Sequence, residues 1–379
     1  MPKTKRIVVK IGSSLLANSD RLTPRFGFLQ RLLEDVARLR GDGYEVVLAS
    51  SGAVALGMNT VGARPETAGL RDKQAAAACG MPLLLNAYKQ VGLEFGFDIA
   101  QVLLTLGDFE DHRRFLNLRN TVARLMKSRI VPIVNENDTI TTEEIRVGDN
   151  DRLAAKIAQM VEAETFIILT GVDGLYDRNP SEPDARLVEE VDDVADYIEA
   201  ASGISELGTG GMLTKLQAAN MAQNAGCTTY IANGEPEYPL SAVLNGKRKC
   251  TKCLPHPDPD SPWETWLADR LQMAGSLVLS DEAARRLDGE HAIERSEVVE
   301  INGDFSRGDV LHIYDSEGKE LARGLTDFTS EETRILMRNL EMPAHQLLGY
   351  QSDGHFIRPE NMVVIEERHL TWDAPDQAA

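Results

Sequence analysis

The chain has 379 residues with 40 basic and 59 acidic side chains, a formal net charge of −19. This length exceeds one ordinary hydrophobic core, so two or three domains are expected. The acidic excess argues against non-specific binding to nucleic acid or anionic membranes, because both need clustered Lys and Arg. No apolar stretch reaches the roughly 18–20 residues of a membrane span, and the basic N-terminus lacks the features of a signal peptide. Four cysteines are too few for a disulfide framework, so a reducing cytoplasm is the expected location.

The first 250 residues alternate short apolar runs with longer amphipathic stretches, which is typical of a parallel sheet covered by helices. Runs such as IVVKI, IVPIV and FIILT are nearly continuous in apolar residues, as strands buried on both faces require. Apolar residues three and four positions apart predict helices over residues 28–39 and 150–161. The expected strands are residues 7–11, 45–49, 99–105, 130–135, 166–170 and 228–232. We therefore expect an α/β fold with a mainly parallel central sheet.

A different pattern begins after a proline-rich segment. Residues 249–266 contain four prolines and interrupt the alternation, which is typical of a domain boundary. From about residue 275 short β-like runs follow one another, and DSEG at 315–318 separates two of them as a hairpin turn would. The C-terminal part therefore predicts a small, mainly β module that ends in a frayed tail.

The first expected strand ends in a lysine and a glycine–serine turn. Lys10 stands within apolar residues, and burying an ammonium without a partner is costly. One interpretation is an edge strand with Lys10 in solvent. The other is a central strand whose carboxyl end faces an anionic ligand, as in open α/β sheets. Gly12 and Ser13 would then let backbone N–H groups approach phosphate oxygens.

Two further strand ends carry small or polar residues. Ser50 and Ser51 precede a glycine, where they could cap a helix or form an anion site. The sequences NEND at 135–138 and GDND at 148–151 could likewise be turns with helix caps. Together these two sequences place seven hydrogen-bonding or acidic side chains on one presumed rim. An amino acid substrate, with its ammonium and carboxylates, needs such a mixture.

The segment GTGGMLTK at 208–215 precedes another helical pattern. It matches neither the Walker A sequence nor the GxGxxG dinucleotide pattern, but it supplies glycines, a helix start and a lysine for nucleotide phosphates. The alternative interpretation is a mobile surface turn. Two lysines, glycine-rich loops and a carboxylate cluster together favour phosphoryl transfer, in which the protein positions both reactants and neutralises charge.

Several other chemistries are excluded by what the sequence lacks. Only His112 of the seven histidines lies before the domain boundary, which argues against a histidine-based triad or a multi-histidine metal site there. The chain has no GxSxG elbow. Cys250 and Cys253 lack a second ligand pair at suitable spacing, so we interpret them as structural or incidental cysteines.

A series of motifs spans residues 5–235: VKIGSS, ASSGAVALG, LLT, NENDT, VGDND, LTGVDGLY and GTGGMLTKLQAA, in this order. The series resembles the amino acid kinase family, and within it the enzymes that phosphorylate the side-chain carboxylate of L-glutamate. The downstream sequence INGDFSRGDV resembles a PUA domain. The resemblance implies a three-layer sandwich with a mainly parallel sheet. Its implied boundaries are a kinase domain at 1–255, a linker at 256–274, a PUA-like β domain at 275–360 and a tail at 361–379.

The resemblance also implies roles for residues of the kinase domain. Lys10 and Lys215 would lie near the β- and γ-phosphates of ATP, and Asp151 would orient both lysines through charge-assisted hydrogen bonds. The implied ATP-binding residues are Lys10, Gly12, Ser13, Thr170, Gly171, Thr209, Gly210, Gly211, Met212, Leu213, Thr214 and Lys215. The family commonly has threonine in place of Ser13 and aspartate in place of Gly171, so one carboxylate of the nucleotide-side loop is missing here, at position 171.

By the same resemblance, glutamate would be held by Ser50, Asp138, Asn150 and Asp149. Asp138 suits the substrate ammonium, and Asn150 suits a carboxylate. Mg²⁺ would accompany ATP, held largely by phosphate oxygens and water, with no dedicated metal site in the protein. The family further implies a homo-oligomer, feedback inhibition by proline, a place at the first step of proline biosynthesis, and handover of the unstable product to a glutamyl phosphate reductase.

Two alternatives compete with this interpretation. The first is a kinase of the same family that acts on acetylglutamate, aspartate or carbamate, although Asp138 favours a substrate with a free amino group. The second is an RNA-binding or RNA-modifying protein, because PUA domains are known chiefly for that. Residues 275–379 carry 10 basic and 22 acidic side chains, a balance of −12 that is unfavourable for binding phosphates.

Overall fold

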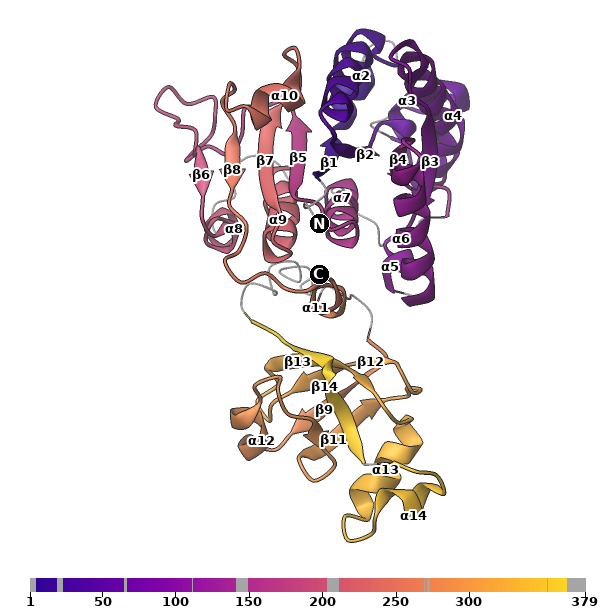
Figure 1. Cartoon of the computed structure of the whole chain (residues 1–379), viewed down its shortest axis with the longest axis vertical. Helices are drawn as coiled ribbons and strands as arrows, with labels where there is room; N and C mark the ends of the chain where they lie inside the picture. The colour runs from indigo at the N-terminus through magenta and orange to yellow at the C-terminus, as the bar shows by residue number, and fades with distance from the viewer. Residues whose placement is uncertain are drawn as a thin grey trace. The chain divides into compact units, whose positions relative to one another are not determined.

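The structure is a computed structural model. It describes residues 5–18, 23–64, 67–110, 112–140, 149–202, 211–268, 270, 273–352 and 354–366. The chain divides into two compact units, one up to Pro259 and one from Asp260, which are each described by themselves. Figure 1 shows the elements of each unit.

The first unit is built around an eight-stranded sheet with the order β3-β4-β2-β1-β5-β7-β8-β6. All six strands expected from the apolar runs are present, and each of their ends lies within one residue of the expected position. The strands are β1 (Arg6–Ile11), β2 (Glu45–Ser50), β3 (Ile99–Leu104), β4 (Val131–Glu136), β5 (Thr165–Thr170), β6 (Glu190–Val191), β7 (Thr228–Asn233) and β8 (Thr251–Cys253).

Strand β1 lies between β2 and β5 and pairs in parallel with both. Lys10 is the register partner of Ala49 on one side and of Ile168 on the other. It therefore belongs to a central strand, and the edge-strand interpretation of Lys10 is excluded. The parallel pairing of β1 with β2, β2 with β4 and β1 with β5 brings the carboxyl ends of these strands to one edge of the sheet, where polar residues follow them.

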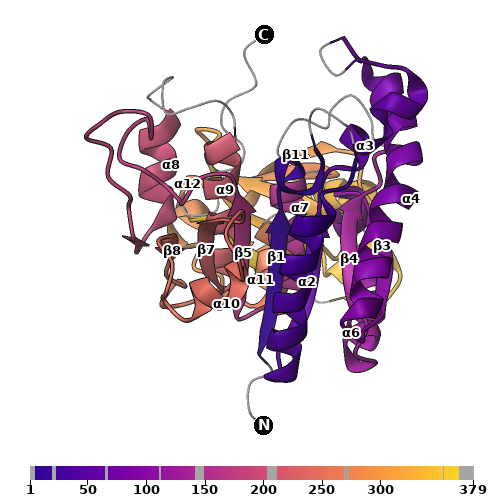
Figure 2. The same cartoon turned by 90° about the horizontal axis from the view of Figure 1, so that it is seen from above.

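Helices cover both faces of this sheet, which gives the expected three layers. Helices α2, α4 and α10 pack their apolar side chains against one face, and α7 and α9 pack against the other, an arrangement that can be followed in Figure 2. The helices are α1 (Ser13–Leu16), α2 (Phe26–Gly41), α3 (Ala53–Val61), α4 (Leu70–Glu94), α5 (Gly107–Glu110), α6 (His112–Lys127), α7 (Asp149–Met160), α8 (Val194–Ser202), α9 (Gly211–Asn224) and α10 (Pro239–Leu244). The predicted helix over residues 28–39 corresponds to α2, and the periodic apolar residues that predict it are buried: Phe28, Leu32, Val36 and Leu39.

Helices α3 and α4 pack against each other at two glycines. A Cβ atom at Gly57 would overlap the backbone of Ala76, and one at Gly80 would overlap the carbonyl of Ala53. Only residues without a side chain let the two helix backbones approach so closely. The contact fixes α4 relative to the start of α3, which directly follows the end of β2.

The second unit holds a six-stranded sheet with the order β10-β14-β13-β12-β9-β11. Its neighbouring strands are antiparallel except for β9 and β12, and β12 and β13 form the hairpin expected around residues 315–318. The strands are β9 (Gly275–Leu279), β10 (Ile293–Glu294), β11 (Val298–Gly303), β12 (Val310–Tyr314), β13 (Glu320–Thr326) and β14 (His355–Val364). The helices are α11 (Pro262–Ala268), α12 (Asp281–Arg286), α13 (Ser330–Arg338) and α14 (Ala344–Leu348).

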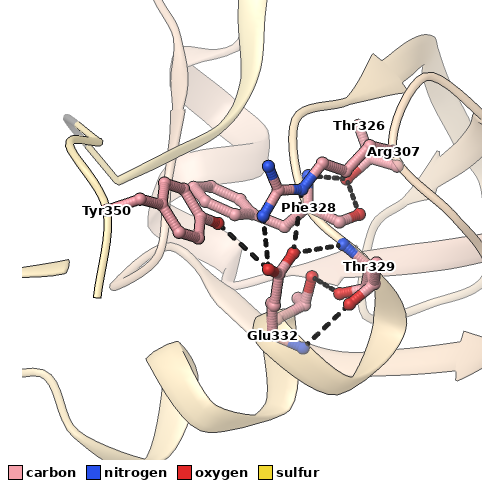
Figure 3. A network of polar contacts seen from close by, with 7 residues as sticks. Arg307, Thr326, Phe328, Thr329, Glu332 and Tyr350 are labelled. Carbon is pink, nitrogen blue, oxygen red and sulfur yellow. Dashed lines mark hydrogen bonds and ion pairs between the residues drawn. The ribbon is translucent and has the colours of Figure 1, made fainter. Parts of the chain in front are cut away.

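A polar network ties α13 to the neighbouring loops of this unit (Figure 3). Thr329 and Glu332 cap the helix reciprocally: each side chain accepts a hydrogen bond from the other residue's backbone N–H. The Glu332 carboxylate also accepts hydrogen bonds from the Arg307 guanidinium and from the Tyr350 hydroxyl, which lies 3.1 Å away. The Arg307 guanidinium in turn lies 4.4 Å from the centre of the Tyr350 ring. One carboxylate thus joins three segments that are distant in sequence.

Strand β8 lies inside the proline-rich segment but within the expected kinase domain at 1–255, and it pairs antiparallel with β7 of the first unit. Two other elements cross the expected boundaries. Helix α11 occupies part of the expected linker at 256–274 and packs against β13 and β14 of the second unit. Strand β14 continues to Val364, four residues into the expected tail. Prolines mark chain direction changes and helix starts as well as linkers, so they do not locate the boundary closely.

None of the described helices is both long enough and apolar enough to cross a lipid bilayer.

Candidate functional site

Two lysines and one aspartate meet at the polar edge of the first unit's sheet. The Lys10 Nζ atom, from β1, lies 2.6 Å from Oδ1 of Asp151, in the first turn of α7. The Lys215 Nζ atom, from the first turns of α9, lies 3.3 Å from Oδ2 of the same carboxylate. The Thr214 hydroxyl donates a hydrogen bond of 2.9 Å to that oxygen. Asp151 is only 2% exposed and Lys10 only 7%, so the cluster is nearly closed to water.

The electrostatics of this cluster follow from burial and the excess of positive charge. Burial by itself would raise the pKa of the Asp151 carboxyl, but the two ammonium groups outweigh it and hold that pKa below its ordinary value. Burial lowers the pKa of Lys215, and the neighbouring Lys10 lowers it further, whereas Asp151 opposes both effects. Two cations share one anion, so the cluster carries a net positive charge that suits a polyanionic ligand.

Backbone groups surround the same edge. Gly12 directly follows β1, its N–H donates to the Leu169 carbonyl, and Ser13 begins α1. Helix α9 begins at Gly211, and the half-buried side chains of Met212 and Leu213 belong to its first turn. Thr170 ends β5, and Gly171 follows it in an exposed position. Thr209 and Gly210, also expected to bind ATP, lie outside the described residues.

A second group of polar side chains lies at the ends of β2 and β4. The Ser50 hydroxyl is 3.1 Å from the Tyr88 hydroxyl, and the Asn150 amide donates a 3.1 Å hydrogen bond to the Ser51 hydroxyl. Neither serine caps α3, whose N-cap residue is Gly52, so the helix-cap interpretation is wrong. Burial raises the pKa of Asp138 to about 6. Asp149 begins α7, next to Asn150.

Comparison with known proteins shows which families the chain matches. Residues 5–233 match the model of the amino acid kinase family. The chain belongs to the amino acid kinase family. Residues 275–342 match the PUA domain, which identifies the second unit.

Curated relatives narrow the similarity within the amino acid kinase family. The chain is 41% identical to a glutamate 5-kinase of Paramagnetospirillum magneticum, over 95% of this chain and 98% of the relative. It is 39% identical to a glutamate 5-kinase of Rhodospirillum rubrum, over 97% of this chain and 98% of the relative. A solved carbamate kinase of Giardia lamblia shares the fold at 18% identity and a TM-score of 0.50, covering 67% of this chain and all of that one.

In this member of the amino acid kinase family, α7 connects the two groups of site residues. Asn150 contacts the serine pair after β2, and the next residue, Asp151, contacts both lysines. A short displacement of this helix start would therefore change both groups at once. The structure thus brings together Lys10, Asp151, Thr214 and Lys215 as one cluster and connects it to Asn150 and Ser51.

Two residues of this edge receive no role from the sequence: Asn135, which the sequence places on the rim only as part of NEND, and Tyr88, which no motif singles out. Asn135 is the next-to-last residue of the fully buried strand β4 and is 2% exposed, yet neither its amide nitrogen nor its amide oxygen has a hydrogen-bond partner among the described residues. Tyr88 comes from the middle of a helix far from any recognised motif. For Asn135, its place in the NEND sequence was a usable signal, because a buried amide needs partners. For Tyr88 the sequence offers no comparable signal.

Among the described residues, no group of three histidine, cysteine, aspartate or glutamate side chains is arranged to hold a metal ion.

Proposed function

We propose that this protein transfers the γ-phosphoryl group of ATP to the side-chain carboxylate of L-glutamate, giving L-glutamyl 5-phosphate and ADP. The observation that carries the proposal is the buried cluster of Lys10, Asp151 and Lys215, with its net positive charge at the ligand-binding edge of the sheet. The curated relatives named glutamate 5-kinase support the choice of glutamate as the acceptor.

In the proposed reaction, an oxygen of the glutamate side-chain carboxylate attacks the γ-phosphorus, and the bond from that phosphorus to the β,γ-bridging oxygen breaks. Negative charge on the transferring group and on the leaving ADP is stabilised by the ammonium groups of Lys10 and Lys215. Asp151 holds both ammonium groups in place and keeps them protonated. Backbone N–H groups at Ser13 and the start of α9 would contact phosphate oxygens. Gly12, whose own N–H donates to the Leu169 carbonyl, would let the phosphates approach the backbone closely because it has no side chain.

The proposed glutamate site is the second group of polar residues. Asp138 would bind the substrate ammonium, and Ser50 and Asn150 would bind its carboxylates, with Asp149 next to them. The amide of Asn135, which has no hydrogen-bond partner in the described part of the chain, supports a polar ligand here, because a buried amide without a partner is costly and a bound ligand would supply one. We propose that Mg²⁺ enters with ATP and is held by phosphate oxygens and water, where it would neutralise phosphate charge.

We further propose that the protein is a cytoplasmic homo-oligomer, that it catalyses the first step of proline biosynthesis, and that proline inhibits it. We also propose that the acyl phosphate product passes to a glutamyl phosphate reductase. These parts rest on the similarity to glutamate 5-kinases over nearly the whole chain.

The test is a coupled assay of ADP release with glutamate, acetylglutamate, aspartate or carbamate as acceptor, each with and without proline. We expect turnover with glutamate and inhibition by proline. Lys10→Ala and Lys215→Ala should each abolish turnover mainly through kcat, and Lys89→Ala, which removes an exposed lysine of α4, should not. Near-normal kcat in either site variant would refute the role assigned to that lysine.

A further inference from the structure

We infer that Tyr88 is a positioning residue that directs the hydrogen of the Ser50 hydroxyl toward a carboxylate of the amino acid substrate. The inference rests on the proposed function and deepens it, because it separates the group that binds a substrate carboxylate from the group that binds the ammonium. It follows from the hydrogen-bonding capacity of two buried hydroxyl groups.

Among the described residues, the Tyr88 hydroxyl has one hydrogen-bond acceptor within reach of its hydrogen. Tyr88 is 0% exposed, and its only hydrogen-bond partner among the described residues is Ser50, 3.1 Å away. Burial raises the pKa of Tyr88, so the phenol keeps its proton. If Ser50 donated to Tyr88, the phenolic hydrogen would be buried with no acceptor in the described part of the chain, and a buried donor without an acceptor is unfavourable. Tyr88 is therefore the donor and Ser50 the acceptor.

This assignment determines what Ser50 can do with its own hydrogen. One lone pair of Ser50 is occupied by Tyr88, and the Ser50 hydrogen points to the Ser51 carbonyl at 3.3 Å. That distance is long for a hydroxyl donor, whose hydrogen bonds cluster near 2.7–2.8 Å. A carboxylate oxygen at the strand end is a stronger acceptor than this carbonyl, because hydrogen bonds to ionised groups are shorter and about twice as strong. The donation from Tyr88 also polarises Ser50 and strengthens it as a donor.

The same orientation makes Ser50 a poor partner for an ammonium group. An ammonium needs acceptors, and Asp138 supplies a carboxylate for it. Ser50 has one lone pair left, and its neutral oxygen is a weaker acceptor for an ammonium than the charged carboxylate of Asp138. The hydrogen bond from Tyr88 therefore favours Ser50 as the partner of a substrate carboxylate and leaves the substrate ammonium to Asp138.

The fold holds Tyr88 firmly enough for this purpose. Its ring belongs to the hydrophobic core between α4 and the sheet, together with Leu84, Ala87 and Val91 of the same helix. The glycine contact between α3 and α4 sets the distance from this helix to the end of β2. A purely structural aromatic residue would need only the ring, so the hydroxyl can be tested separately from packing.

The experiment compares Tyr88→Phe, Ser50→Ala and the double variant of the full chain in the glutamate-dependent assay, with Tyr44→Phe as the matched control. Tyr44 packs against the same core. Removing one hydrogen bond that orients a ligand-binding donor should raise the glutamate KM about fivefold to tenfold in Tyr88→Phe. The kcat, the ATP KM and the melting temperature should stay close to those of the unmutated protein, and Tyr44→Phe should change none of them.

The double variant distinguishes positioning from packing. If Tyr88 acts through Ser50, Tyr88→Phe raises the glutamate KM no further once Ser50→Ala is present, so the two effects are not additive. The inference is overturned by an unchanged glutamate KM in Tyr88→Phe, or by the same fold increase in both backgrounds. Absence of glutamate-dependent turnover in the unmutated protein would overturn the proposed function and this inference with it. Turnover with an unchanged KM in Tyr88→Phe overturns the inference alone.

Discussion

Substitution of Asp151 by asparagine tests how the buried cluster works, because it removes the shared negative charge and preserves the shape of the side chain. In the unmutated protein, Oδ2 of Asp151 lies 3.3 Å from Nζ of Lys215. With an effective dielectric constant of about 20, two unit charges at this distance attract by about 5 kcal/mol. Solvent relaxation and the second lysine reduce the net effect, and opposite charges this close typically shift a pKa by about 1–3 units.

The direction of the expected shift in the pH profile follows from the pKa of Lys215. Burial lowers the pKa of Lys215, and Asp151 opposes that effect. Without the carboxylate this pKa falls further, so Lys215 loses its proton at a lower pH and can no longer neutralise phosphate charge. We expect the alkaline limb of the kcat/KM profile to move down by about 1–3 pH units in Asp151→Asn.

The assay is glutamate-dependent ADP release from pH 6 to 10, at matched ionic strength. Asp108→Asn is the control, because Asp108 pairs with the mostly exposed Arg114 and lies outside the cluster. Its pH profile should match that of the unmutated protein. An Asp151→Asn profile of reduced height but unchanged alkaline limb would refute the reasoning, because it would show that Asp151 does not keep Lys215 protonated.

Three further predictions address other parts of the chain. Because burial raises the pKa of Asp138 to about 6, the glutamate KM should rise as the pH falls below about 6, whereas in Asp138→Asn it should be high at every pH; a pH-independent KM in the unmutated protein would contradict this. Gly80→Ala should lower the free energy of unfolding by about 1–3 kcal/mol or more, measured by thermal denaturation, because its Cβ would overlap backbone. Gly41→Ala, which meets open space, should not. Glu320 has a pKa of about 2, because hydrogen bonds from His312 and Arg323 outweigh its burial. The resulting stabilisation is present above pH 4.5 and is lost as the pH falls toward about 2. Glu320→Gln should therefore lower the melting temperature of the second unit at pH 7 and make little difference near pH 2. All three tryptophans lie after residue 260, so their emission reports this unit.

The sequence predicts the sheet of the first unit well because its strands are buried on both faces. Such strands are continuous apolar runs, and their ends are visible where polar residues begin. Strands β6 and β8 escape prediction because they are only two and three residues long and lie at the sheet edge, where β8 pairs antiparallel with β7 and β6 pairs in parallel with β8. Their pairing is decided by tertiary contacts, which outweigh local propensity in so short a segment.

The residue types at the site can be predicted from the sequence pattern. Which of these side chains contact one another cannot be predicted from that pattern. A lysine inside an apolar strand indicates a buried partner or ligand, but the residue pattern alone does not name Asp151 as that partner; only the family resemblance implies this pairing. The hydrogen bond between Ser50 and Tyr88 joins a strand end to the middle of a long helix. Tyr88 stands in an ordinary amphipathic pattern, where an aromatic residue indicates only a core position. Contacts of this kind depend on how helices are placed on the sheet.

The position of β1 at the centre of the sheet has a consequence for the order in which the chain folds. As the chain leaves the ribosome, β1 meets β2 within the first 50 residues, but its other neighbour begins with Thr165, more than 150 positions after Ile7. Long-range pairings of this kind form late, because the intervening loop must close first. Until then Lys10 stays in water, where its charge costs nothing. Asp151 lies in α7 and Lys215 lies in α9, and both helices are synthesised long after β1. The cluster of Lys10, Asp151 and Lys215 is therefore complete only when most of the first unit has been synthesised. A nascent chain can therefore hold most of its hydrophobic core before it has any phosphoryl-transfer chemistry.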